Sequence, residues 1–223
     1  VGDDEAGRAL TQQMRALGCD VSQVAVIPGG STAVYAAVLD HDHDLLIGIA
    51  DMDVFDALTP QVLGRAWPHL VASALVFADC NLPQDSLADL LHRKRDAAFS
   101  LALDTVSVLK ARRLPHDLSA IDVLFTNRDE ALAVLGGGSS LSQAEAARQL
   151  CARGARHVVL TDGARGVVVA SAAACHFLPS LAVNMVDASG AGDGLIAGTL
   201  QAMLNGADVN TAVKSGLLVA ALT

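Results

Sequence analysis

A glycine-rich segment late in the chain carries the residues best suited to chemistry. Asp187-Ala-Ser-Gly-Ala-Gly-Asp193 leads through Gly194 into the apolar run 195–200, a pattern typical of a tight turn followed by a helix. The N-terminus of a helix presents unpaired backbone N–H groups and the positive end of the helix dipole, so this turn could hold a phosphoryl group. Glycine is needed there because a larger side chain would hold the phosphoryl group away from the donors.

Asp193 could act as a general base at this turn. Its carboxylate would accept the proton of an attacking hydroxyl, while the backbone amides of Gly190, Ala191 and Gly192 would neutralise charge on the transferred phosphoryl group. The chemistry indicated is phosphoryl transfer to an alcohol. A simpler interpretation stays open, in which the glycines form a flexible loop and Asp193 only caps the helix.

The residues before this turn predict the scaffold that would position it. Short apolar runs at 74–77, 99–103, 123–125 and 157–160 alternate with helical stretches such as 84–95 and 142–153, the second with a Ser142/Glu145 capping box. This alternation predicts an α/β fold with a doubly wound, mainly parallel sheet and helices on both faces. A hairpin over 167–177 and two helices, from about Ala191 and Asp208, should follow.

The first fifty residues have a different pattern. Residues 3–17 predict a helix that stops at Gly18, and the apolar runs 24–27, 32–39 and 45–49 predict a small antiparallel β-meander without helices. The organisation expected is an α/β nucleotide-binding core over 1–23 and 51–223, with a β-strand lid over 24–50. Because the chain starts without Met and stops within an apolar helical pattern, we expect it to be truncated at both ends and the core to be incomplete.

Composition excludes several classes of protein. The net charge of −9 and the lack of any basic run argue against nucleic-acid binding, and no apolar run reaches the roughly 18 residues needed to span a membrane. The four cysteines share no CxxC spacing, so the sequence suggests no zinc site and no disulfide framework. We therefore expect a cytoplasmic protein with reduced thiols and a small-molecule substrate.

The string 187–193 resembles the C-terminal signature of the ribokinase-like (PfkB) kinase family, usually Asp-Thr-x-Gly-Ala-Gly-Asp. The last Asp of that signature is the general base, which corresponds to Asp193 here, and Ala188 replaces the usual Thr. The resemblance implies an ATP-dependent kinase in which Gly190, Ala191 and Gly192 form the anion hole.

Two further strings follow the order of the same family. Asn127-Arg-Asp-Glu130 resembles its Asn-x-x-Glu element, whose Glu helps to organise Mg²⁺ and phosphates through water. Thr161-Asp-Gly163-Ala-Arg-Gly166 resembles the Thr-x-Gly-x-x-Gly turn that lies against the nucleotide phosphates. Alone, the first could be only a capped helix start and the second a plain β-turn. Together they imply ATP and Mg²⁺ as cofactors, and the family leaves room for a monovalent cation.

The substrate is indicated only by resemblance. Segments 32–40, 49–53 and 106–110 resemble the pseudouridine-kinase branch of the family, which implies a sugar or nucleoside substrate and favours pseudouridine. A kinase for another sugar or nucleoside, or a nucleotide-binding fragment or pseudokinase without turnover, stays open. The lid could close over the bound substrate and exclude water. Its exposed edge could also pair with a second copy in a homodimer.

Overall fold

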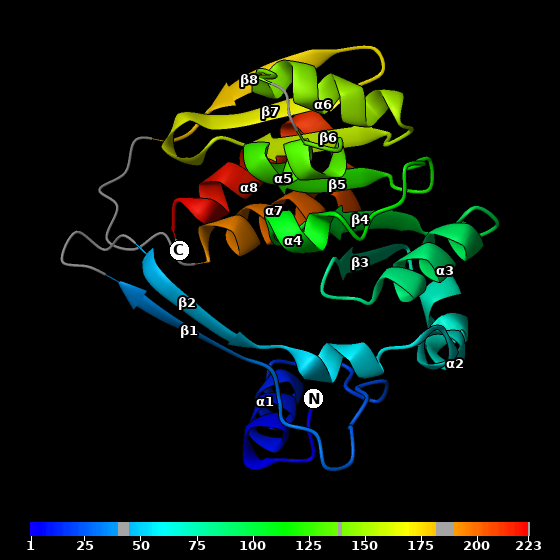
Figure 1. Cartoon of the computed structure of the whole chain (residues 1–223). Helices are drawn as coiled ribbons and strands as arrows, with labels where there is room; N and C mark the ends of the chain where they lie inside the picture. Colours follow the sequence, from blue (N-terminus) through cyan, green and yellow to red (C-terminus); the bar gives the residue numbers. More distant parts are fainter. Residues whose placement is uncertain (40–44, 138–139, 182–189, 223) are drawn as a thin grey trace. The chain divides into compact units, whose positions relative to one another are not determined.

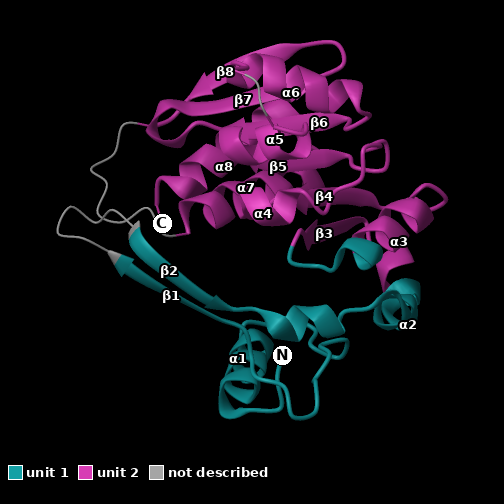
Figure 2. Ribbon diagram, in the orientation of Figure 1, with its two compact units in different colours: residues 1–68, 81–86 teal, residues 69–80, 87–223 magenta. Residues whose placement is uncertain are grey.

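The computed structural model describes residues 1–39, 45–137, 140–181 and 190–222, without the side chains of Leu39 and Leu45. The chain forms two compact units (Figure 2). The first contains residues 1–68 and 81–86, and the second contains residues 69–80 and 87–223.

A six-stranded sheet organises the second unit (Figure 1). Its strands lie side by side in chain order, and β3 to β6 are parallel whereas β7 and β8 are antiparallel. The strands are β3 (Leu75–Asp79), β4 (Ser100–Asp104), β5 (Val123–Asn127), β6 (His157–Thr161), β7 (Gly166–Ser171) and β8 (Cys175–Pro179). All four predicted parallel strands and the predicted hairpin are therefore confirmed.

Helices cover both faces of this sheet (Figure 1). They are α3 (Gln84–Lys94), which begins in the first unit, α4 (Val108–Ala111), α5 (Arg128–Val134), α6 (Gln143–Ala152), α7 (Ala191–Leu204) and α8 (Val209–Ala220). The capping box of α6 is present as the sequence predicts, because Ser142 and Glu145 bond each other's backbone N–H groups. The predicted α/β fold with a mainly parallel sheet is confirmed.

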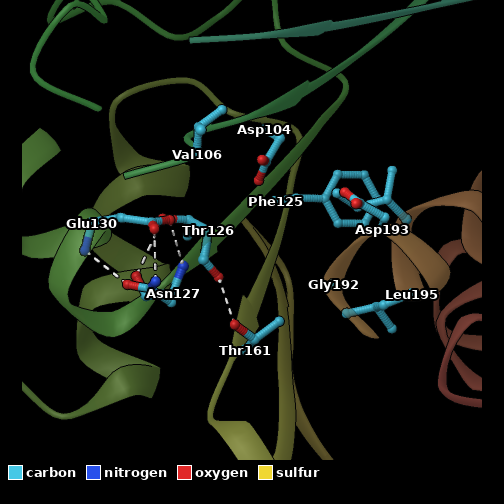
Figure 3. Close-up of a pocket in the computed structure, with 11 residues that line it drawn as sticks. Asp104, Val106, Phe125, Thr126, Asn127, Glu130, Thr161, Gly192, Asp193 and Leu195 are labelled. Carbon is cyan, nitrogen blue, oxygen red and sulfur yellow. Dashed lines mark hydrogen bonds between the residues drawn. The ribbon is translucent and has the colours of Figure 1, made fainter. Parts of the chain in front are cut away.

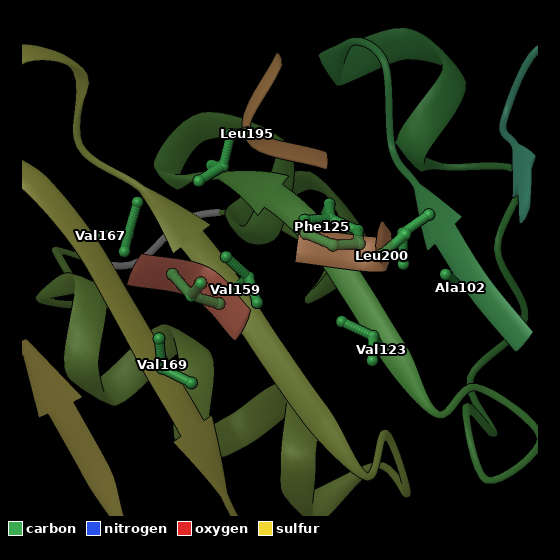
Figure 4. Packing of buried hydrophobic residues seen from close by; sticks show 9 residues of the cluster. Ala102, Val123, Phe125, Val159, Val167, Val169, Leu195 and Leu200 are labelled. Carbon is green, nitrogen blue, oxygen red and sulfur yellow. The ribbon is translucent and has the colours of Figure 1, made fainter. Parts of the chain in front are cut away.

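Alternation along the strands divides the core into two layers. Val123, Phe125 and Val159 pack with Leu195 and Leu200 of α7 in one buried cluster (Figure 4). The residues between them, such as Leu124 and Val158, point to the opposite face and are also fully buried, because successive side chains of a strand alternate. Burial on both faces explains why these strands appear in the sequence as continuous apolar runs.

Asp4 connects the helix of the first unit to a distant segment. It caps α1 (Glu5–Ala16) by accepting the Gly7 N–H at 2.7 Å, and it also accepts the N–H and hydroxyl of Thr32, each at 2.6 Å. These hydrogen bonds favour the ionised carboxylate and lower the pKa of Asp4 to about 2.

The rest of the unit includes an antiparallel pair, β1 (Val34–Leu39) and β2 (Leu45–Asp51), a 3₁₀ helix (Asp53–Ala57) and the start of α2 (Pro60–Val71).

The predicted strand over 24–27 is wrong. Only a single parallel bridge forms there, between Ile27 and Gly2, with the Ile27 N–H donating to Val1 O at 2.9 Å. Gly29, at φ 69°, then turns the chain away before β1 begins at Val34. The predicted meander is therefore a two-stranded hairpin, and its predicted turn, 40–44, lies outside the described residues.

Among the described residues, no helix is long and apolar enough to cross a membrane.

Gly166 should be far less tolerant of substitution than another glycine with positive φ. A Cβ at Gly166 would lie 2.1 Å from the Leu178 carbonyl oxygen, whereas a Cβ at Gly206 would meet nothing within 4 Å. Gly166→Ala should lower the free energy of unfolding by about 2–5 kcal/mol, and Gly206→Ala by only about 1–2 kcal/mol. Urea unfolding of both variants measures this, and equal losses would contradict the steric explanation.

Candidate active site

The carboxyl ends of β4, β5 and β6 meet the N-terminus of α7 at one pocket (Figure 3). The three strands end at Asp104, Asn127 and Thr161, and parallel strands place such ends at the same edge of a sheet. The cavity has a volume of about 170 Å³. Its lining consists of Asp104, Val106, Phe125, Thr126, Asn127, Glu130, Thr161, Gly192, Asp193, Leu195 and Ile196.

The N-terminus of α7 has the features of an anion site. Gly190 precedes the helix in the left-handed conformation, at φ 81°, and its carbonyl accepts the Gly194 N–H at 2.8 Å as the first helical bond. Helix geometry leaves the N–H groups of the first turn without intrahelical partners. A Cβ at Gly190 or Gly192 would meet nothing within 4 Å among the described residues, so none of those residues blocks the backbone here. Asp187 and Ala188, which belong to the same sequence motif, lie outside the described residues.

Glu130 is held by a capping box that is also part of the pocket. Asn127 caps α5 by accepting the Glu130 N–H at 3.0 Å, and Glu130 accepts the Asn127 side-chain amide at 2.7 Å and its backbone N–H at 3.2 Å. The interpretation of this segment as a capped helix start is therefore correct. However, Glu130 is only 7% exposed and lines the cavity, which a surface capping box would not require.

The turn after β4 contributes residues that the three phosphate-site motifs do not include, although Val106 begins the resembling segment 106–110. Thr105 is fully buried, and its hydroxyl donates to Glu130 Oε2 at 2.5 Å. Val106 lines the pocket with φ at 65°, a rare conformation for a β-branched residue and a source of local strain. The available signal was their position at the end of a predicted parallel strand, where ligand sites of such sheets lie.

The pKa of Asp104 is strongly raised. Burial, together with the nearby charges of Glu130, Asp79 and Asp193, raises it from 3.8 to about 7, against a hydrogen bond from the Val106 N–H that lowers it. Burial and like charge both disfavour the ionised carboxylate. Near neutral pH, both the protonated and the ionised form of Asp104 are therefore populated.

Only part of the predicted nucleotide-binding turn, 161–166, lines the pocket. Thr161 lines the pocket, and its hydroxyl donates to Thr126 O at 3.4 Å. Gly163 has φ at 55° and no described residue within 4 Å of an added Cβ, whereas Gly166 packs against β8, and neither glycine lines the cavity. Asp162, between them, forms an ion pair with Arg165. The pocket thus unites Asn127, Glu130, Thr161, Gly192 and Asp193 among the predicted site residues, and Gly190, Ala191, Gly163 and Gly166 lie outside its lining.

Two side chains of the pocket could serve as ligands of Mg²⁺. Glu130 and Asn127 supply oxygen ligands, which Mg²⁺ prefers, but no group of three His, Cys, Asp or Glu side chains in the described part of the chain could hold a metal ion. Mg²⁺ usually keeps several waters and binds through one or two carboxylates together with substrate phosphates. The residues present fit a Mg²⁺ ion that arrives with a nucleotide.

Comparison with known proteins gives the family. The pfkB family of carbohydrate kinases matches residues 1–223, and the chain belongs to this family. Pseudouridine kinase of Escherichia coli (strain K12) is 28% identical over 211 residues, which are 92% of this chain and 66% of that protein. The match thus spans just under two thirds of the length of that relative.

Solved structures agree with the fold. A carbohydrate kinase from Agrobacterium tumefaciens is 31% identical with a TM-score of 0.80, and the match covers 100% of this chain and 71% of that one. Ribokinase from Thermotoga maritima, at 19% identity, has a TM-score of 0.79, with 99% of this chain and 71% of that one covered. The expected ribokinase-like fold is confirmed.

Asp104→Asn should stabilise the protein more at high pH than at low pH. An acid whose pKa rises from 3.8 to about 7 on folding binds its proton more tightly when folded, so the folded state loses stability as pH rises between these values. Asn removes that cost and can still accept the Val106 N–H. The gain in unfolding free energy should be about 2–3 kcal/mol greater at pH 8 than at pH 5.

Urea unfolding of Asp104→Asn at the two pH values measures this difference. Asp117→Asn is the control, because hydrogen bonds from Ser119 lower the pKa of this exposed acid, and its removal should bring no gain at pH 8. An Asp104→Asn gain that does not change between pH 5 and pH 8 would contradict the assignment.

Proposed function

We propose that the chain transfers the terminal phosphoryl group of ATP to a hydroxyl of a sugar or nucleoside. The observation that carries the proposal is the position of Asp193 in the first turn of α7, lining one pocket with Asn127, Glu130 and Thr161. A candidate base would then act beside a helix terminus suited to an anion and beside candidate ligands for the nucleotide and its metal. Membership of the pfkB family supports the same reaction.

Asp193 has the role of general base in this proposal. Its carboxylate accepts the proton of the acceptor hydroxyl as that oxygen attacks phosphorus, the bond from phosphorus to the bridging oxygen of ATP breaks, and ADP leaves. The backbone N–H groups at Gly190, Ala191 and Gly192 stabilise the negative charge of the phosphoryl group in transit. None of the described residues lies close enough to Gly190 or Gly192 to block the close approach that this requires.

The remaining residues bind and orient the nucleotide. Glu130 and Asn127 would hold Mg²⁺, which when bound neutralises phosphate charge. Thr161 can donate its hydroxyl to a phosphate, and Gly163 allows the backbone to approach it, whereas Gly166 contributes by keeping the turn against β8.

Pseudouridine is the acceptor that we propose. The support is similarity to the Escherichia coli pseudouridine kinase and the resemblance of segments 32–40, 49–53 and 106–110 to that branch. A cytidine kinase of Thermococcus kodakarensis is 27% identical, so other nucleosides belong in the same test.

The test is ADP release by the purified chain with Mg²⁺-ATP and pseudouridine, uridine, cytidine, ribose or adenosine, each offered separately. We expect turnover with pseudouridine to exceed that with the other acceptors. Another preferred acceptor would replace pseudouridine and retain the reaction. Binding of ATP without any turnover would contradict the kinase proposal and favour a nucleotide-binding protein. The same assay in K⁺ and Na⁺ salts tests for a monovalent-cation requirement.

Asp193→Asn in this assay should lower turnover about 10²–10⁴-fold and leave ATP affinity nearly unchanged, because only the base is lost. Asp208→Asn is the matched control. Asp208 also stands at a helix N-terminus, where it caps α8, and Asn caps as well as Asp does. Equal turnover by Asp193→Asn and the wild-type chain would exclude Asp193 as the base.

The β1–β2 hairpin supports the proposal of a homodimer. Val38, Ile47 and Ile49 lie on one face of the pair and are 47%, 56% and 63% exposed, an apolar strip without cover in the first unit. Tyr35 lies on the other face and packs over Gly48, whose added Cβ would meet the Tyr35 ring.

Ile47→Lys should shift the sedimenting species toward the monomer, because it places a charge in the apolar strip. A wild-type chain that is monomeric at micromolar concentration would exclude this dimer.

A further inference from the structure

We infer that Thr105 is a positioning residue, whose hydroxyl fixes the Glu130 carboxylate for binding Mg²⁺-ATP. The inference rests on the proposed function, in which Glu130 helps to hold the metal and the phosphates. It concerns a residue outside all three sequence motifs.

The contacts of Thr105 point to Glu130. Thr105 is 0% exposed, and its Oγ1 lies 2.5 Å from Glu130 Oε2, 2.9 Å from Thr126 Oγ1 and 3.3 Å from Phe125 O. A hydroxyl has a single proton to donate. The carboxylate is both the nearest acceptor and the charged one, and hydrogen bonds to charged acceptors are the shorter and stronger kind. The Thr105 hydroxyl therefore donates its hydrogen bond to Glu130.

Glu130 is then held by donors from two separate strands. Its Oε2 accepts from the Thr105 hydroxyl of the β4 turn and from the Asn127 N–H, at 3.2 Å, at the end of β5. Its Oε1 accepts one bond, from the Asn127 side-chain amide at 2.7 Å. Oε1 consequently retains the greater capacity to accept a further hydrogen bond.

The capping box of α6 shows that a third donor is not part of helix capping itself. Glu145 occupies the same position relative to its cap, and its Oε2 accepts the N–H and the hydroxyl of Ser142 at 2.9 and 2.7 Å. Both of these donors belong to the cap residue, and this carboxylate is exposed. The α5 box differs in being buried, in lining the pocket and in receiving a hydroxyl from another strand. The extra donor is therefore a feature of the pocket and not of helix capping.

The backbone around Thr105 is specialised for this placement. The Thr105 N–H continues the pairing with β5 by donating to Phe125 O at 3.2 Å. The chain then reverses at once, since the Ser107 N–H donates to Thr105 O at 2.7 Å across Val106 at φ 65°. The turn leaves Thr105 in line with β4 and ends the strand immediately after it.

The experiment measures binding of ATP by calorimetry, with and without MgCl₂, to the wild-type chain, Thr105→Val and Thr105→Ser. Valine keeps the shape and removes the hydroxyl, whereas serine keeps the hydroxyl. We expect Thr105→Val to weaken binding of Mg²⁺-ATP about 10–100-fold, the usual cost of losing a residue that orients a metal ligand, and to leave binding of metal-free ATP nearly unchanged. Thr105→Ser should restore Mg²⁺-ATP affinity to within about threefold of wild type.

Thr199→Val is the matched control for loss of a buried hydroxyl. Thr199 is 0% exposed in α7, and its hydroxyl has no hydrogen-bond partner among the described residues, so its removal should leave Mg²⁺-ATP affinity unchanged. Thermal unfolding of each variant shows whether it folds, and Thr105→Ser carries the test if Thr105→Val does not.

The outcomes separate this inference from the proposed function. If the wild-type chain binds Mg²⁺-ATP and folded Thr105→Val binds it equally well, the role of Thr105 is wrong and the proposed function stands. A folded Thr105→Ser with the affinity loss expected of Val would overturn the role as well. If the wild-type chain binds no ATP under any condition, both the proposed function and the inference fail.

Discussion

The parallel pairing of β4, β5 and β6 is the constraint on which the candidate site depends. Asn127 pairs with Thr161, so β5 and β6 end in register, and β4 ends nearby at Asp104, which pairs with Phe125 on β5. The polar residues that follow the strands can lie at this edge without entering the apolar core. Because α7 packs Leu195 and Leu200 against the same sheet, its N-terminus is brought to that edge as well. The packing of the core thereby sets the geometry of the pocket.

The cost of this arrangement is an accumulation of negative charge. Asp104, Glu130 and Asp193 line one small cavity, and the raised pKa of Asp104 reports the repulsion together with the burial. Glu130 is stabilised by donors from Thr105 and Asn127, while the N-terminus of α7 supplies the opposite dipole near Asp193. Such a site favours a ligand that brings positive charge with it, as a metal nucleotide does.

Local patterns allowed most of the second unit to be predicted from sequence. The strands over 123–125 and 157–160, the Asn127 cap of α5, the capping box of α6 and the start of α7 at Ala191 all depend on residues close together in the chain. The roles of Asp104 and Thr105 could not be predicted in this way, because they depend on the register between β4 and β5. The error at 24–27 has a similar cause, since the pairing of this run with Val1–Asp3 is a contact between segments far apart in the sequence, and only Ile27 forms a bridge. A local apolar pattern does not reveal how many residues will find a partner strand.

The double role of Glu130 couples the order of a helix to occupancy of the pocket. The same carboxylate caps α5 and lines the cavity. A ligand that binds this carboxylate therefore contacts the group that stabilises the first turn of α5. Thermodynamic linkage then requires that any ligand which prefers the capped form also stabilises that form, in proportion to the logarithm of its concentration. Conversely, fraying of the first turn of α5 would lower the apparent affinity of the pocket. At this position, selection for tight binding and selection for a stable helix act on one residue and cannot be satisfied separately.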